Sequence, residues 1–181
     1  NDEYVWIGTE GGGVDRMDKR TGAFRNVMGK GQMASLNVKS LVVGRENDLW
    51  VSTFRGGIYQ FNSSGRLKKN YLHVSGDTTS LLVNNIRKTV AVGDTGMWVA
   101  YQHPYLRISY FSMHDQKFTH YTLEKKQAYL FDMFRQGDRT LWCVSHDALY
   151  RLDTRTGEVQ RFAPDNSVYL RLFTACLDDS G

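Results

Sequence analysis

Four tryptophans recur at nearly even intervals along the 181-residue chain, and this spacing limits the fold more than any other feature. They are Trp6, Trp50, Trp98 and Trp142, with separations of 44, 48 and 44 residues. Each lies in a short run of β-branched, aromatic and other apolar residues, which is typical of a buried strand. The four tryptophans are therefore expected to pack between neighbouring units of a repeat with a period near 45 residues.

Paired glycines follow the tryptophan strand in the first two repeats. Gly12 and Gly13 stand in the first repeat, and Gly56 and Gly57 stand in the second. An alternating run begins directly after each pair, so the glycines are expected to form the turn between two strands. A phosphate-cradling loop is not expected, because neither a Gly-Lys-Ser/Thr sequence nor a helix start follows them.

A second kind of turn follows each of these alternating runs. Asp18 opens such a turn and Gly22 closes it, and Asp153 and Gly157 hold the same positions in the fourth repeat. An Asp at the start and a glycine near the end are typical of a type I turn that ends in a left-handed residue. A third strand leaves each turn, which predicts a β-hairpin.

A fourth strand precedes each later tryptophan at a fixed distance. Apolar or β-branched residues stand 12 and 9 positions before Trp50, Trp98 and Trp142. The repeat therefore has four strands and no room for a helix, which is the sequence signature of a propeller blade. We predict an all-β fold, a β-propeller built of four-stranded antiparallel blades, with about four blades present as an excerpt of a larger propeller.

The phase of the repeat divides the propeller segment 1–181 into blades. A partial first blade covers 1–34, and further blades cover 35–80, 81–126 and 127–167. Residues 168–181 align with the first strand of the second blade. They are expected either to open the next blade or to fold back and complete the first. Open strand edges invite pairing between copies, so a homodimer through these edges is a further expectation.

Two segments carry a resemblance to a known repeat. The first is Trp-Ile-Gly-Thr-Glu-Gly-Gly-Gly-Val, starting at Trp6, and the second is Leu-Trp-Val-Ser-Thr-Phe-Arg-Gly-Gly-Ile, starting at Leu49. With the turns that begin at Asp18 and Asn62, they resemble the two-component regulator propeller repeat. The resemblance covers nearly the whole chain: two copies match closely, the fourth matches fairly and the third departs clearly.

This family is similar to the periplasmic sensor regions of hybrid two-component system histidine kinases in gut Bacteroidetes, which typically detect glycan fragments. The resemblance implies a non-enzymatic, periplasmic, carbohydrate-sensing segment that signals to a kinase in the parent protein. The implied partners are an oligosaccharide or other small ligand, the remaining blades and the kinase.

The residues give little support to catalysis, a cofactor or a metal site. The five histidines occupy different positions in different repeats, and no His-x-Glu-x-x-His or Cys-x-x-Cys spacing occurs. The formal charge of +4 comes from basic residues spread over turns and strand edges, without the pattern of a nucleic-acid-binding module. We therefore assign no catalytic residue, no cofactor, no metal and no nucleic-acid partner.

The third repeat departs from the rule that the first two obey. In place of the glycine pair it has a connection that is two residues longer and contains tyrosine, histidine and arginine. Aromatic rings and hydrogen-bonding groups together suit carbohydrate, because sugar faces stack and hydroxyls pair. The candidate ligand-binding residues are Tyr101, Gln102, His103, Tyr105, Arg107 and His146. The alternative is that this loop fills a local gap or meets a neighbouring domain.

Two other functions stay open at the level of sequence. A propeller lyase or hydrolase could assemble a site from distant loops, and His103 or His146 would then be needed for turnover. A scaffold that binds only protein would use the face around Tyr105 to contact another domain.

Overall fold

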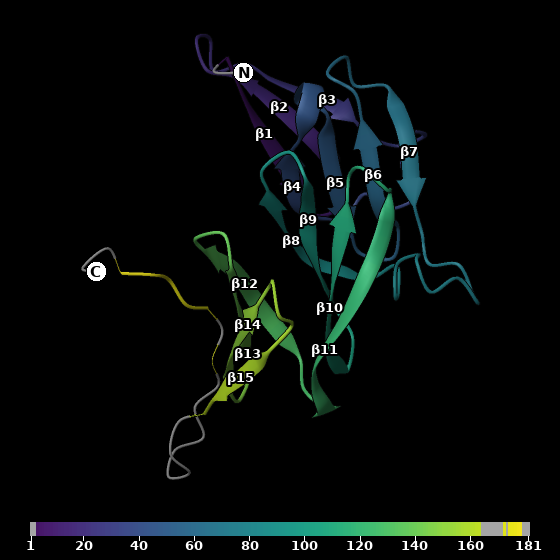
Figure 1. Cartoon of the computed structure of the whole chain (residues 1–181). Coiled ribbons are helices and arrows are strands. Elements are labelled where there is room, and N and C mark those ends of the chain that lie inside the picture. Colours follow the sequence, from purple (N-terminus) through teal and green to yellow (C-terminus); the bar gives the residue numbers. More distant parts are fainter. Residues whose placement is uncertain (1–2, 164–171, 173, 179–181) are drawn as a thin grey trace.

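The computed structural model describes residues 3–163, 172 and 174–178, and these residues form four antiparallel sheets (Figure 1). Blade 1 contains β1 (Tyr4–Thr9), β2 (Gly13–Asp18) and β3 (Phe24–Met28). Blade 2 contains β4 (Val38–Val43), β5 (Leu49–Thr53), β6 (Gly57–Phe61) and β7 (Leu67–Tyr71). Blade 3 contains β8 (Ile86–Val92), β9 (Gly96–Tyr101), β10 (Tyr105–Ser112) and β11 (Lys117–Gln127). Blade 4 contains β12 (Leu130–Gln136), β13 (Thr140–Ser145), β14 (Leu149–Asp153) and β15 (Val159–Phe162).

Helical structure is limited, in the part of the chain described, to the short 3-10 turn η1 (Arg45–Asn47). No helix among these residues has the length and apolar character needed to cross a membrane. The prediction of an all-β fold made of propeller blades is confirmed.

The sheets follow one another around an arc, from blade 1 in purple to blade 4 in yellow-green (Figure 1). Within each blade the strands pair in chain order, so each sheet is a simple meander. The first strands of successive blades contact one another, β4 with β8 and β8 with β12. Ser40 Oγ of β4 donates to the Thr89 carbonyl oxygen of β8 at 3.2 Å. Side-chain contacts of this kind join the blades along the inner edge of the arc.

The tryptophan strands hold the blades together. Trp6 packs against an apolar cluster that includes Leu49 and Phe61 of the second blade, and the ring of Trp50 lies 5.3 Å from that of Phe111 in the third. Trp98 lies in one apolar cluster with Leu141 and other residues of the fourth blade. Trp50 and Trp98 are each only 3% exposed, because a sheet covers both faces of their strands. Trp142 is half-buried, and its ring lies 5.8 Å from that of Phe162 in its own blade.

Gly13 and Gly57, the second members of the two glycine pairs, begin the second strands of their blades. Gly57 has φ of +72°, and a Cβ placed there would lie 2.2 Å from the carbonyl oxygen of Tyr71 on the outer strand. Gly13 has φ of +81°, and its Cβ would lie 2.1 Å from the carbonyl oxygen of Met28. The absence of a side chain therefore allows both the left-handed backbone and the close approach of the outer strand.

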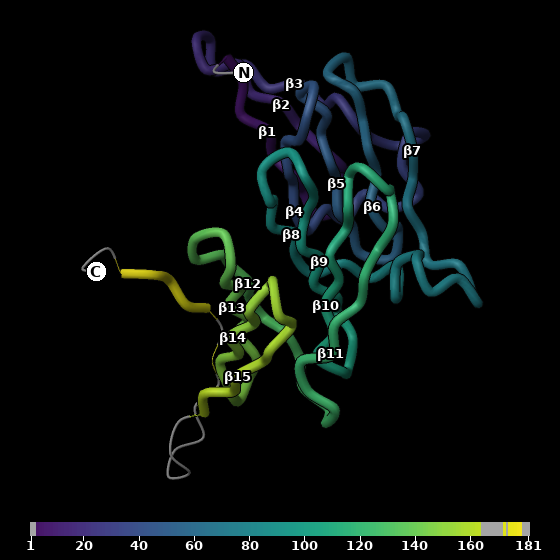
Figure 2. The backbone as a smooth tube through the Cα atoms, in the orientation of Figure 1, coloured from purple at the N-terminus to yellow at the C-terminus, as the bar shows by residue number. Residues whose placement is uncertain are grey.

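Most of the segment 168–181, expected as an opening strand, lies outside the described residues. Leu172 and residues 174–178 form no strand. The Leu172 N–H donates to the carbonyl oxygen of His146 at 3.2 Å, and Thr174 Oγ1 donates to Asp132 Oδ2 at 2.6 Å. Leu172 and Thr174 of this segment, yellow in Figure 2, therefore contact blade 4. In the repeat register, Asp132 of β12 corresponds to Ser40 of β4. Thr174 therefore contacts blade 4 at the same inner position through which β4 contacts β8.

The exposure of the tryptophans predicts how much each contributes to stability. Trp98→Ala is expected to lower the free energy of unfolding by about 3–5 kcal/mol, because it opens a cavity between two packed sheets. Trp142→Ala serves as the matched control, and less than about half of that loss is expected because its ring already contacts solvent. Urea denaturation followed by circular dichroism measures both values. Equal losses for the two variants would show that the sheet interface is not the main source of stability.

Candidate functional site

The sheets present one set of connections at a common end, which we call the loop face. In blades 3 and 4 it consists of residues 102–104, the end of β11 with the crossover that follows it (124–129), and residues 146–148. The Ala128 N–H donates to the Pro104 carbonyl oxygen at 2.9 Å, so the crossover between these blades lies against the β9–β10 hairpin. The third-repeat insertion and the crossover are thus one continuous surface.

The structure separates Tyr101 from the other candidate ligand-binding residues. Tyr101 is 2% exposed at the end of β9, and its hydroxyl lies 2.8 Å from Ser109 Oγ. Burial raises the pKa of its phenol to about 12, since the charged form would lose its hydration. Tyr101 therefore belongs to the core beneath the loop face.

The remaining candidates of the third repeat lie at the surface. Tyr105 is 49% exposed at the start of β10, and its ring centroid lies 5.6 Å from that of His103. The Tyr105 N–H donates to His103 Nδ1 at 3.1 Å, which orients the imidazole. Gln102 and Arg107 are also exposed, and Leu106 points into the core between Tyr105 and Arg107 as strand alternation requires.

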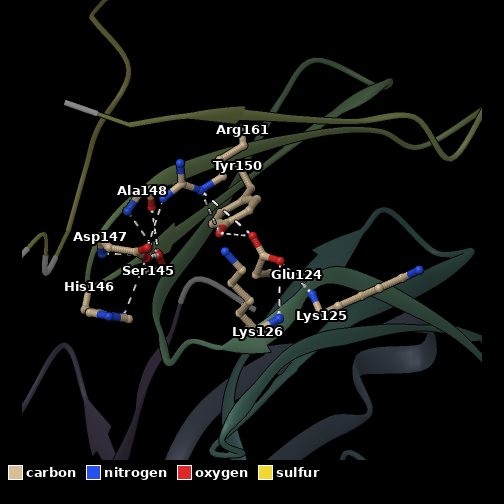
Figure 3. Close-up of polar contacts among 9 residues, drawn as sticks. All are labelled: Glu124, Lys125, Lys126, Ser145, His146, Asp147, Ala148, Tyr150 and Arg161. Carbon is tan, nitrogen blue, oxygen red and sulfur yellow. Dashed lines mark hydrogen bonds and ion pairs between the residues drawn. The ribbon is translucent and has the colours of Figure 1, made fainter. Parts of the chain in front are cut away.

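A network of ionic and polar groups links the two blades at this face (Figure 3). Arg161 of β15 is at its centre: Nη2 lies 3.0 Å from Asp147 Oδ2, and Nε donates to the Tyr150 hydroxyl at 3.3 Å. The same Nε lies 3.9 Å from Glu124 Oε2 of blade 3, and the Tyr150 hydroxyl donates to that oxygen at 3.4 Å. Ser145 Oγ donates to Asp147 Oδ1 at 2.6 Å. One cation therefore holds carboxylates from two blades.

The network keeps both carboxylates ionised. Burial alone would raise the pKa of Asp147, but hydrogen bonds from Ser145 and Arg161 outweigh it and hold that pKa below its usual value. The backbone N–H groups of Lys126 and Lys125 lower the pKa of Glu124, with smaller contributions from Tyr150 and Arg161. At neutral pH the site therefore has fixed charges and oriented dipoles, an arrangement that suits recognition of a polar ligand.

His146 is half-buried beside this network. Its Nδ1 is buried and has no hydrogen-bond partner among the residues that the structure describes. Asp147 Oδ1 lies 3.6 Å from it, which is too long for a hydrogen bond. Buried polar atoms are nearly always paired, so this nitrogen is an exception within the described part of the chain.

A serine and a histidine also meet in the third blade, Ser109 Oγ lying 2.7 Å from His120 Nδ1. Such a pair is a feature of nucleophilic enzymes, but Ser109 is fully buried and its hydroxyl also contacts Tyr101. A substrate cannot reach that oxygen, so the pair stabilises the packing of β9, β10 and β11. Within the described ranges, no group of three or more His, Cys, Asp or Glu residues could hold a metal ion.

Sequence reasoning missed the centre of the network, which consists of Glu124, Asp147, Tyr150 and Arg161. One signal was present: the fourth repeat has Ser-His-Asp-Ala at 145–148, where the first two repeats have their glycine pairs. Two of the four repeats, not one, therefore replace turn glycines with functional groups, and these two are adjacent. The pairing of Glu124 with Arg161 has no signal in the sequence, because 37 residues separate them.

No family model and no curated protein sequence matches the chain. Solved structures do match. The extracellular domain of BT3049 from B. thetaiotaomicron, a protein assigned as a hybrid two-component system, aligns with 18% identity and a TM-score of 0.74. The extracellular domain of BT4673 from the same organism, also assigned as a hybrid two-component system, aligns with 16% identity and a TM-score of 0.57. The β-propeller domain of Cps50 (Swd1) from Myceliophthora thermophila aligns with 17% identity and a TM-score of 0.62.

These alignments cover most of this chain and only part of the others. The alignment with the BT3049 domain includes 90% of this chain and 23% of that domain. The alignment with the BT4673 domain includes 98% of this chain and 30% of that domain. For Cps50 the shares are 89% and 52%. The chain thus spans about a quarter to a half of these propeller-containing structures. At such identities the likeness demonstrates the propeller fold, and two of the three structures are of the class that the sequence resemblance predicts.

The network at the loop face predicts a pH-dependent loss of stability. Arg161→Ala is expected to raise the pKa of Asp147 and to lower the free energy of unfolding at neutral pH by about 1 kcal/mol or less, because both groups are partly solvated. The pKa of folded Asp147 is below the unfolded value of about 3.9. Its contribution is therefore present above that pH and is lost as the pH falls through the folded pKa.

Carbon-13 NMR of the Asp147 carboxyl group measures the change in pKa, and urea denaturation at several pH values measures the stability. Arg155→Ala is the matched control, because Arg155 touches neither Asp147 nor Glu124 among the contacts described. An unchanged Asp147 titration in the Arg161 variant would contradict the proposed role of the guanidinium.

Proposed function

We propose that this chain is part of the ligand-sensing propeller of a two-component receptor and acts outside the cytoplasm. The structural likeness to the extracellular domains of BT3049 and BT4673 supports this proposal, together with the two-component regulator repeats in the sequence. The segment itself binds and does not catalyse, and a kinase in the parent protein receives the signal.

The proposed ligand is a glycan fragment, bound at the loop face of blades 3 and 4. The exposed ring of Tyr105 offers a surface on which a sugar face can stack. His103 beside it and the partly exposed ring of His146 offer hydrogen bonds to hydroxyls. Lys125 and Lys126 lie exposed at the same face, so their ammonium groups can reach ring oxygens or acidic sugar groups.

We further propose that blades 1 and 4 pack against additional blades of the parent protein. Phe24 on blade 1 is 64% exposed and Phe162 on blade 4 is 44% exposed. By strand register Phe24 corresponds to Phe118 of blade 3 and Phe162 to Tyr71 of blade 2, and both of these counterparts are buried. The same exposed edges would otherwise support pairing between copies of the chain.

Calorimetric titration with a panel of oligosaccharides tests the ligand. Tyr105→Ala is expected to weaken binding about 10-fold, since loss of a stacking ring costs about 1–1.5 kcal/mol. Phe24→Ala removes an exposed aromatic ring from a distant blade and is the matched control, with no change expected.

Either of two results would count against this proposal. One is the absence of binding to any glycan by the complete receptor ectodomain. The other is turnover of a glycan that is abolished by His103→Ala or His146→Ala, which would place the chain among propeller lyases or hydrolases.

A further inference from the structure

An open groove between blades 1 and 2 presents two arginine side chains and, among the described residues that line it, no carboxylate. It lies at the opposite end of the sheets from the loop face, and its volume is about 270 Å³. One wall consists of Trp6, Arg16 and Arg25 of blade 1, and the other contains Ser63 and Ser64 of the β6–β7 turn of blade 2. We call it the arginine groove. Because a water molecule occupies about 30 Å³ in the liquid, the groove has room for a polyatomic ligand.

The strand register places the two arginines side by side. Trp6 of β1 is paired with Arg16 of β2, and Arg16 is paired with Arg25 of β3. Residues that are directly paired across strands have Cβ atoms about 4.5–5.5 Å apart on one face of the sheet. Two like charges in such a pair repel each other and destabilise the sheet. The pair therefore calls for an anion close to both guanidinium groups.

The same row differs in the other three blades. The two residues that follow the tryptophan across the sheet are Gln60 and Lys69 in blade 2, Tyr110 and Thr119 in blade 3, and Arg151 and Gln160 in blade 4. Each of these rows has at most one basic side chain. The arginine pair is therefore a feature of blade 1 and not of the repeat.

The corresponding groove between blades 2 and 3 contains an acid that blade 1 lacks. Asp48 stands two residues before Trp50, and its Oδ2 lies 2.7 Å from Lys68 Nζ. In blade 1 the same position is Tyr4, whose ring centroid lies 4.0 Å from Arg16 Cζ. Stacking on a neutral ring orients the guanidinium group but does not cancel its charge.

Three carboxylates of blade 1 lie outside the arginine groove. Asp15 Oδ1 accepts a hydrogen bond from Asn26 Nδ2 at 2.7 Å. Glu3 and Asp18 line a separate hollow, where Lys19 and Arg20 supply two opposite charges. Hydrogen bonds from Thr21 hold the pKa of Asp18 below its usual value, and the charge of Arg16 makes a smaller contribution. On the side of blade 2, the charged neighbour of the turn is the exposed Arg66. The groove therefore keeps a net positive charge.

Hydrogen-bond donors on both walls are accessible to a ligand. Arg25 is exposed, and its side chain has no hydrogen bond or ion pair with the residues that the structure describes. The exposed hydroxyl group of Ser63 is likewise without a partner in that part of the chain. A guanidinium group presents five N–H donors in a planar fork, which matches the oxygens of a phosphate group. The two walls can therefore donate to one anion from opposite sides.

We propose that the arginine groove binds a phosphate group, either free or as the monoester of a small molecule. Its oxygens accept hydrogen bonds from Arg16 and Arg25 on one side and from Ser63 Oγ on the other. At neutral pH a phosphate monoester carries a charge between −1.5 and −2, which balances two guanidinium groups. A carboxylate balances only one of them, and a neutral sugar balances neither. The proposal is independent of the glycan site, which lies at the other end of the blades.

Nitrogen-15 NMR of the four indole N–H groups tests the proposal, with inorganic phosphate as the probe at constant ionic strength. We expect a saturable shift of the Trp6 signal, half-complete at about millimolar concentration because so small a ligand makes few contacts. The signals of Trp50, Trp98 and Trp142 are internal controls and should not saturate. Sodium chloride at the same ionic strength should leave Trp6 without a saturable shift. Glucose 6-phosphate distinguishes the two sources of the group, since tighter binding than that of phosphate would identify an ester as the ligand.

Two variants locate the binding. Arg25→Gln changes an exposed side chain and is expected to weaken phosphate binding about 10-fold, because it removes a charged donor. It should also raise the midpoint of urea denaturation in phosphate-free buffer, since the repulsion from Arg16 is removed. Arg151→Gln is the matched control, because Arg151 has the register position of Arg16 in blade 4, and it should leave phosphate binding unchanged.

Three results would overturn the proposal. The first is the absence of a saturable Trp6 shift with phosphate, and the second is an equal shift with sodium chloride. The third is an Arg25→Gln variant that binds phosphate as tightly as the unsubstituted chain does.

Discussion

Packing of one sheet against the next is the interaction on which the rest of this structure depends. A four-stranded sheet with two apolar faces cannot bury both of them alone, so each blade is stabilised by its neighbours. Trp50 and Trp98 stand where these faces meet, and each is almost fully buried. Trp142, on the last of the described sheets, has only its own blade to pack against and stays half-buried.

This packing leaves the ends of the strands free to vary. The turn glycines of the first two repeats allow a close approach of the outer strand, and the third and fourth repeats replace them with polar and aromatic residues. At the loop face the result is an ionic network around Arg161, flanked by the exposed ring of Tyr105 and the half-buried ring of His146. The candidate site arises where the third and fourth repeats depart from the first two.

Much of the fold could be predicted from the sequence because it follows from local periodicity. Even spacing of tryptophan, alternation of apolar residues and the Asp-to-Gly turns specify strands and hairpins without long-range information. The turn chemistry is visible in the structure: Asp18 Oδ1 accepts the N–H groups of Arg20 and Thr21, and Gly22 has φ of +71°. The candidate site was predicted less completely. Its location at the third-repeat connection came from a length difference, but the burial of Tyr101 could not be read from it.

The sequence by itself determined that this protein is a row of four-stranded units whose tryptophans face their neighbours. Only the tertiary structure decided which side chains meet across the units. Glu124 and Arg161 belong to different blades, and so do Trp50 and Met113. Strand patterns are set by each residue's near neighbours, whereas these pairings depend on the twist and stacking of whole sheets. The nitrogens of Trp50 and His146 that have no hydrogen-bond partner among the described residues are defined in the same way, since a missing partner can be recognised only from the surrounding atoms.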